Sequence, residues 1–323
     1  MAVSGQFLTS IQTTLLPIYL EKKLLETLDK NLQLYNLTPL KRSVPRGMGT
    51  TMVFNQAVHI AAQTTALSES LTPAQVQMSA EIVSAAVKVY GAFTVLSELS
   101  KMSMIDVTWV NDELAYNAAL TIDTLIRNEF NASASGIGTP GTTSAAMLLT
   151  GGRVQRAVTR LRNLDVPGLF GDSMALVCHP NALYDVMSDT ATAGWVDLVK
   201  QSGTPDADKL ATRGLVGEVF GARVFQSTNV FSSADGSAGL TGNVYRNQIF
   251  GRNAYAVVRL SGPEGGNLAN PQVIVKDLGS AGTEDPLNMR SSIGWKAIFA
   301  PLFLKTTTDA GHGAIVYTGV TAI

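Results

Sequence analysis

The chain has 323 residues, of which 46% are hydrophobic, enough for a sizeable core and, by length, for about two domain-sized units. Its formal net charge is −1, which excludes a protein that binds nucleic acid through bulk positive charge. Only 15% of the residues are charged, against about 25% in a typical soluble domain, and this favours a surface that other copies of the chain cover.

Cysteine content and hydropathy narrow the class further. Cys178 is the single cysteine, so a disulfide within the chain is excluded. The N-terminus lacks a basic segment followed by an apolar run, so no signal peptide is expected. No apolar run reaches the roughly 18 residues that a membrane-spanning helix needs, so we expect no membrane partner.

Residues 15–33 are predicted to form an amphipathic helix. On its charged side, Glu26 and Lys30 have the i,i+4 spacing of an ion pair. The helix ends before Pro39, because the residue before a proline avoids the α region. It is either an ordinary surface helix of its own domain or an arm that packs on a neighbouring subunit. Its apolar stripe consists of Leu20, Leu24, Leu25, Leu28 and Leu32.

Two strand-like runs follow, with a long gap between them. The first covers residues 51–54 and 58–60, and the second alternates apolar residues over 83–95. The gap, residues 63–80, is polar, contains Pro73 and is much longer than a hairpin loop. A ribbon with so long a tip is marginal by itself, so we expect it to lie on another surface. A plain β-meander with a loop is the alternative.

A long helix is predicted next, capped at its N-terminus by Asn111 or Asp112 and ending near Phe130. Asp123 and Arg127 have the spacing of an ion pair along this helix. One side of the helix is apolar and should face a core. This stripe consists of Leu114, Ala118, Ile122, Leu125 and Ile126.

Helices and strands alternate after the small residues at 131–151, of which 131–136 are predicted to be a linker. A buried strand is predicted at 174–178. Pro180 suits the first position of the helix that follows. Further strands are predicted at residues 219–226, 248–260, 272–277 and 291–304.

One helix of this region has an apolar face and an arginine face. Its apolar residues are Val154, Ala157, Val158, Leu161 and Leu164. An arginine face is usually just solvated, but four cations on one helix could neutralise nucleic-acid phosphates locally. The possible DNA-facing residues are Arg153, Arg156, Arg160 and Arg162.

The chemical motifs do not predict an enzyme. Residues 136–141 match the glycine pattern of dinucleotide sites, but they follow a helix and a linker where that pattern needs a strand. Cys178 and His179 are neighbours on a predicted strand, so their side chains should point to opposite faces. The three histidines lack metal-ligand spacing. We expect no catalytic residue, no cofactor and no metal.

Several stretches, taken in chain order, resemble one protein family. Residues 89–97 are similar to the return strand of that family's extended loop, and residues 112–130 are similar to its long spine helix. Residues 163–185 resemble its succession of helix end, Val-Pro turn, strand and short helix. Residues 217–229 are similar to the next strand pair, and 285–300 to the return strands. The family is that of the major capsid proteins of tailed double-stranded DNA bacteriophages, which have the HK97-like capsid fold.

The resemblance implies an α+β fold in five parts. They are an N-terminal arm at residues 1–45, an extended β-loop at 46–97, a peripheral domain with the spine helix at 98–150, an axial domain at 151–284, and return strands of the peripheral domain at 285–323. A member of this family is structural: it self-assembles into pentamers and hexamers of an icosahedral shell around DNA.

The resemblance also implies partners and a location. The location is the virion, with assembly in the cytoplasm of the host bacterium. No long acidic helical segment precedes the arm, so the scaffolding protein is expected to be a separate chain. A portal and packaged double-stranded DNA, contacted without sequence specificity, are the other partners, with decoration proteins as a possible addition.

Two other functions stay open. The shell of an encapsulin-like compartment shares this fold and would enclose cargo proteins instead of DNA. The alternative from another class is a cysteine-dependent enzyme that uses Cys178 and His179, and it requires that Cys178→Ala abolishes an activity.

Overall fold

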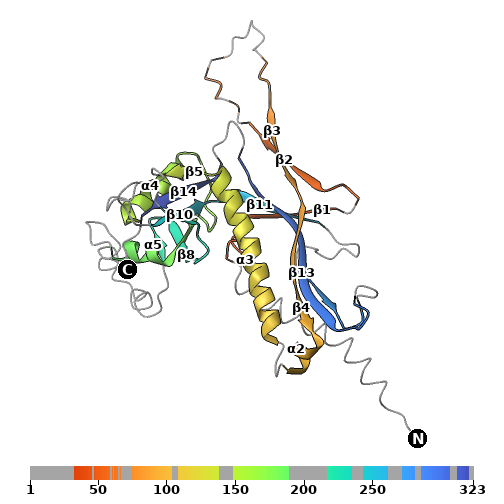
Figure 1. Cartoon of the computed structure of the whole chain (residues 1–323). Coiled ribbons are helices and arrows are strands. Elements are labelled where there is room, and N and C mark those ends of the chain that lie inside the picture. Colours follow the sequence, from red (N-terminus) through yellow and green to blue (C-terminus); the bar gives the residue numbers. More distant parts are fainter. Residues whose placement is uncertain are drawn as a thin grey trace.

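The structure of the chain, a computed structural model, describes residues 33–45, 47–58, 60, 62–64, 66, 75–103, 108–137, 148–188, 217–234, 243–260, 271–280, 285–305 and 311–319. The described part contains a five-stranded sheet, a seven-stranded sheet and a two-stranded ribbon, with a long helix between the two larger sheets (Figure 1). This is the mixed α+β class that the sequence predicted.

The five-stranded sheet is built around β13 (Arg290–Phe303). β4 (Lys88–Ser97) pairs with β13 antiparallel, and so do β12 (Gln272–Lys276) and β11 (Tyr255–Leu260). β1 (Leu40–Val44) pairs with β11 in parallel. β1 and β4, from the first third of the chain, therefore pair with strands from its last third.

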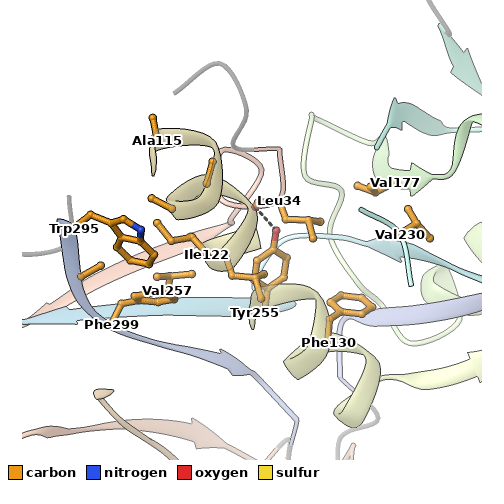
Figure 2. Packing of buried hydrophobic residues seen from close by; sticks show 14 of the residues in the cluster. Leu34, Ala115, Ile122, Phe130, Val177, Val230, Tyr255, Val257, Trp295 and Phe299 are labelled. Carbon is orange, nitrogen blue, oxygen red and sulfur yellow. Dashed lines mark hydrogen bonds between the residues drawn. The ribbon is translucent and has the colours of Figure 1, made fainter. Parts of the chain in front are cut away.

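Helix α3 (Thr108–Ser133) covers one face of this sheet and follows the short helix α2 (Glu98–Ser103). The indole Nε1 of Trp295 donates to Asn117 Oδ1 on α3 at 3.1 Å. Figure 2 shows the core below the helix, from Trp295 and Phe299 to Phe130. Phe130 packs edge-on against Tyr255 and Phe303, so the end of α3 is fixed to β11 and β13.

β6 (Met174–Cys178) lies inside the seven-stranded sheet and is buried throughout. Met174, Leu176 and Cys178 face a cluster formed with α4 (Gly151–Arg162) and α5 (Pro180–Met187), whereas Ala175 and Val177 face the α3 cluster. The sheet is thus covered on both faces, which explains the uninterrupted apolar run of β6. Its other strands are β5 (Ser135–Ile137), β7 (Glu218–Val219), β8 (Ala222–Gln226), β9 (Ser232–Ala234), β10 (Asn243–Phe250) and β14 (Gly313–Thr318).

The two-stranded ribbon projects from this body (Figure 1). β2 (Thr51–Ala57) and β3 (Ala80–Ala86) pair antiparallel, from Thr51 opposite Ala86 to Ala57 opposite Ala80. At its root, Ala85 packs with Val258 and Ala300 of the five-stranded sheet. The predicted pairing of two strands with a long gap is therefore confirmed.

The second predicted strand, residues 83–95, is in fact two strands in different sheets. β3 ends before Val87, whose N–H donates to Thr50 O at 2.9 Å. β4 begins after Val87 and pairs with β13 instead of with the ribbon. Residues 248–260 are likewise divided between the two larger sheets, as β10 and β11, whereas residues 219–226 form β7 and β8, which pair with each other in one sheet. Alternation of apolar residues predicts strands but cannot show which neighbour each one pairs with.

Three predictions about the long helix were wrong. It begins at Thr108, before the predicted caps Asn111 and Asp112. It runs on to Ser133, and β5 follows at once where a linker over residues 131–136 was expected. Asp123 and Arg127 bind separate partners instead of each other, because each lies against a different part of the chain.

The predicted helices of the second half are confirmed with one exception. Val154, Ala157, Val158 and Leu161 are buried on α4. Leu164 is exposed, because the helix ends at Arg162 and Asn163 caps it. Pro180 occupies the first turn of α5, and the preceding residue His179 caps that helix by accepting the N–H of Asn181 at Nδ1, 3.2 Å away.

Candidate assembly surfaces

The outer face of β4 is apolar and exposed. Val89, Phe93 and Val95 point away from α3, and Phe93 is 75% exposed, whereas Tyr90, Ala92 and Leu96 on the other face pack into the core. Exposed apolar residues in a row, unlike scattered ones, indicate a surface that another molecule covers. We call Val89, Phe93, Val95 and Ile274 the outer sheet face.

The register of the sheet makes the outer sheet face continuous. Phe93 and Ile274 lie on either side of Gly294, so the three residues form one row across β4, β13 and β12. A Cβ at Gly294 would lie 2.7 Å from Cβ of Phe93. A side chain at this position would therefore displace Phe93. Lys276 and Lys296 occupy the neighbouring rows, so the apolar row has cations beside it.

The ribbon carries further exposed apolar side chains. Val53 on β2 and Ile82 on β3 lie on the face of the ribbon opposite Ala85, and Ile82 is 69% exposed. Of the predicted gap at 63–80, the structure describes 63, 64, 66 and 75–80, and all of these residues are exposed. The described part of the gap thus contributes nothing to a core. The ribbon is the second candidate assembly surface.

The leucines of the predicted arm, Leu20 to Leu32, lie outside the described residues. The described chain begins at Gln33, where the carboxylate of Asp123 accepts the backbone N–H groups of Gln33, Leu34 and Tyr35 at 2.8, 3.3 and 3.1 Å. Figure 2 shows the hydroxyl of Tyr255 donating to Leu34 O, at 2.8 Å. We call residues 33–37 with these bonds the arm root.

Asp123 is buried, and burial raises the pKa of its carboxyl group to about 6, although the N–H groups of Gln33 and Leu34 lower it. Sequence reasoning placed Asp123 on the helix but paired it with Arg127. The arm root could not be found from helical spacing, because it joins residues about 90 positions apart in the sequence.

One turn of α3 also holds the seven-stranded sheet. Nη1 of Arg127 donates to Asn229 Oδ1 at 2.8 Å and to Asn229 O at 3.0 Å. Nδ2 of Asn229 donates to Thr124 Oγ1 at 3.2 Å. Burial lowers the pKa of Arg127. The sequence did not predict this role of Asn229, because the residue belongs to no recognisable motif.

The four arginines of α4 lie in different surroundings. Nη1 of Arg153 donates to Tyr317 O at 3.1 Å, and Nη1 of Arg160 donates to Gly136 O at 2.9 Å. These bonds join α4 to β14 and to the edge strand β5. Arg156 and Arg162 are exposed. Burial and the nearby charge of Arg156 lower the pKa of Arg153.

Cys178 and His179 do not form a nucleophile and base. Cys178 is fully buried in β6, and burial raises the pKa of its thiol to about 12. A thiol that stays protonated at neutral pH is a poor nucleophile. His179 stacks on Tyr245 with ring centroids 4.3 Å apart, and its Nδ1 is used in capping α5.

The described residues do not support a dinucleotide site, a metal site or a membrane-spanning helix. Gly136 and Ile137 of the glycine pattern belong to β5, and residues 138–141 lie outside the described residues. Among the described residues, no group of three or more His, Cys, Asp or Glu side chains could hold a metal ion. Nor does the described part of the chain contain a helix with the length and apolar character to cross a membrane.

Comparison with known proteins identifies the architecture. No protein-family model matches the sequence, and no curated protein matches it. Among solved structures, the capsid of Ralstonia phage GP4 has a TM-score of 0.61, with 17% identity over 87% of each chain. A structure from Mycobacterium phage Che8 has a TM-score of 0.58, with 14% identity over 83% of this chain and 84% of its own.

The chain has the HK97-like capsid fold. At these identities the likeness concerns the fold alone. A virus-like particle from Pyrococcus furiosus is also similar, with a TM-score of 0.54 and 9% identity over 92% of this chain and 97% of its own. The HK97-like capsid fold explains why a projecting ribbon, a long helix and a mixed α/β region follow one another in this chain.

Proposed function

We propose that the protein is the major capsid protein of a tailed double-stranded DNA bacteriophage. The observation that carries this proposal is the HK97-like capsid fold over 87% of the chain, shared with a phage capsid. The outer sheet face and the ribbon support it, because their exposed apolar residues need a cover. Pentamers and hexamers of the chain form an icosahedral head shell, in which modest contacts repeat by symmetry.

The proposal also assigns a role to each segment of the chain. Residues 1–45 act as the arm, 46–97 as the extended loop, 98–150 and 285–323 as the peripheral domain, and 151–284 as the axial domain. The arm and the loop overlap neighbouring subunits. The chain acts as a structural protein and not as an enzyme, which fits the high pKa of the Cys178 thiol and the capping role of His179.

We also propose partners for the shell. A separate scaffolding protein guides assembly in the host bacterial cytoplasm, a portal occupies one vertex, and decoration proteins bind outside. In the virion, DNA contacts the inner surface without sequence specificity. Arg156 and Arg162 are the better candidates for such contacts, because Arg153 and Arg160 already bind backbone carbonyls.

Electron microscopy of the purified protein, expressed with the scaffolding protein of its own genome, tests the proposal. We expect the expressed protein to form closed icosahedral shells. Shells isolated from phage particles should in addition protect their DNA from nuclease. A protein that stays monomeric at high concentration with scaffold present contradicts it.

The likeness to the Pyrococcus furiosus virus-like particle favours one other candidate, the shell of an encapsulin-like compartment. Shells that contain a defined enzyme and no DNA would support that candidate. Mass spectrometry of disrupted shells, together with nucleic-acid staining, separates the two contents in one preparation.

A further inference from the structure

One side of α3 carries a row of exposed apolar residues. Trp109, Tyr116 and Leu120 are 56%, 47% and 39% exposed. At 3.6 residues per turn they fall within about 40° of one another around the helix, and they span about 16 Å along it. These three residues are the α3 stripe. It lies on the same side of the helix as Asp123 and Arg127, which continue it toward the C-terminus.

The described chain begins at this stripe. Gln33 lines a pocket of about 430 Å³ together with Tyr116 and Leu120. Its N–H donates to Asp123, one turn beyond Leu120. The arm root is fixed there by three bonds to Asp123 and by the bond from Tyr255 to Leu34. Gln33, the first described residue, therefore lies next to the α3 stripe.

The preceding sequence has a matching apolar row. The predicted helix over residues 15–33 carries leucines from Leu20 to Leu32 on one side. Twelve residues of α-helix span about 18 Å, which is close to the length of the α3 stripe. Two apolar rows of similar length that meet at the arm root can cover each other.

We propose that in the unassembled subunit the N-terminal helix, residues 15–33, packs in parallel along its own α3 and covers the α3 stripe. The occupant of this surface is thus a segment of the same chain. In this position the arm is held against its own subunit before assembly, and both apolar rows are removed from water.

The arm root sets the register of this pairing. Gln33 directly follows the leucine row and is bonded to Asp123, so we take an offset of about 90 between the numbers of residues that face each other. With this offset Leu28 lies level with residue 118, between Tyr116 and Leu120. Leu32 lies level with residue 122, just beyond Leu120. The apolar side chains of the two rows therefore alternate, as in packing of ridges into grooves.

Charge supports the same register and direction. An offset of 90 places Lys22 and Lys23 level with Asp112 and Glu113 near the start of α3. Opposite charges at one level favour the parallel arrangement. The contact of the arm with a neighbouring subunit, which belongs to the proposed function, then requires the arm to leave its own α3. The present inference depends only on the arm root and the stripe, so it would survive a failure of shell assembly.

A disulfide test uses the full chain as dilute, unassembled subunits. In the proposed register, Leu28 faces residue 118, so the pair Leu28→Cys and Leu120→Cys places two thiols about two residues apart along the helix axis. In the control pair, Leu28→Cys and Asn128→Cys, the thiols are about 15 Å apart along that axis. Disulfides need Cα atoms within about 7 Å. Under mild oxidation we expect an intramolecular crosslink in the first pair at least tenfold faster than in the control. Cys178 is buried and common to both.

A second variant tests whether the leucine row is responsible. Leu24→Asp added to the first pair should slow crosslinking at least fivefold, whereas Leu15→Asp, which lies before the start of the α3 stripe in this register, should not. Circular dichroism and the melting temperature verify that each variant is folded. Crosslinked dimers would show that the arm of a second copy occupies the stripe, and equal rates in both pairs would show that nothing docks there in this register. Either result overturns the proposal.

Discussion

At the scale of single residues, burial decides what Cys178 can do. Its thiol is enclosed in β6 with a pKa raised to about 12, so it should resist alkylation in the native protein. We expect Cys178→Ala to lower the free energy of unfolding by about 1 kcal/mol and to leave shells intact. Chemical denaturation measures the first quantity and electron microscopy the second. Loss of infectivity with intact shells would reveal a function of the thiol that burial does not suggest.

Asp123 should give the protein a measurable pH dependence. Its pKa is about 6 in the native state and about 4 when unfolded, so the native state binds the proton more tightly. The free energy of unfolding should therefore rise as the pH falls from about 6 to about 4, by up to about 3 kcal/mol if Asp123 acted alone. Asp123→Asn should flatten this part of the profile. An unchanged profile in the variant would mean that other groups produce the slope.

At the scale of elements, the ribbon should be separable from the fold of the subunit. Ala57 and Ala80 face each other, so Asn-Gly in place of residues 58–79 closes a two-residue hairpin in the existing register. The melting temperature should change little, because the described residues of the removed segment are exposed except for the half-buried Val58. Shell closure should be lost. Hydrogen exchange of residues 75–80 in the intact chain should be fast in subunits and slow in shells, and equal protection in both would contradict an assembly role.

The outer sheet face should behave in the same way. Phe93 is exposed on β4, so Phe93→Asp should change the stability of the isolated subunit by no more than about 0.5 kcal/mol. Assembly measured by light scattering should be strongly reduced, because a carboxylate would have to be buried at the contact. Glu98→Gln, on the neighbouring helix α2, is the matched control for a change of charge at the surface. Normal assembly of the Phe93 variant would exclude this face from the subunit contacts.

At the scale of the whole molecule, the two larger sheets share one core. Phe130 of α3 packs against Phe250 of the seven-stranded sheet and against Tyr255 and Phe303 of the five-stranded sheet. Phe130→Ala should therefore destabilise both sheets together, by about 3–5 kcal/mol. Amide exchange measured in β10 and β13 should accelerate in parallel. Acceleration confined to one sheet would show that the two sheets unfold independently.

Sequence patterns alone determined the elements whose apolar periodicity is strong. The buried run at 174–178, the apolar face of α4 and the start of α5 at Pro180 are local properties, so they could be predicted correctly. The low charge content also indicated a surface covered by other molecules, since composition does not depend on the path of the chain.

Tertiary structure decided how these elements are paired and which faces remain exposed. The sequence contains one apolar alternation from Val83 to Val95, but the structure divides it at Val87 into two strands of different sheets. As a result, Ala85 is buried at the ribbon root, whereas Phe93 is exposed on the outer sheet face. Asp123 was expected to bind Arg127 four residues away and instead binds the arm root about 90 residues away. Local spacing carries no information on contacts between distant segments, and those contacts set the burial, the pKa and the partners of each side chain.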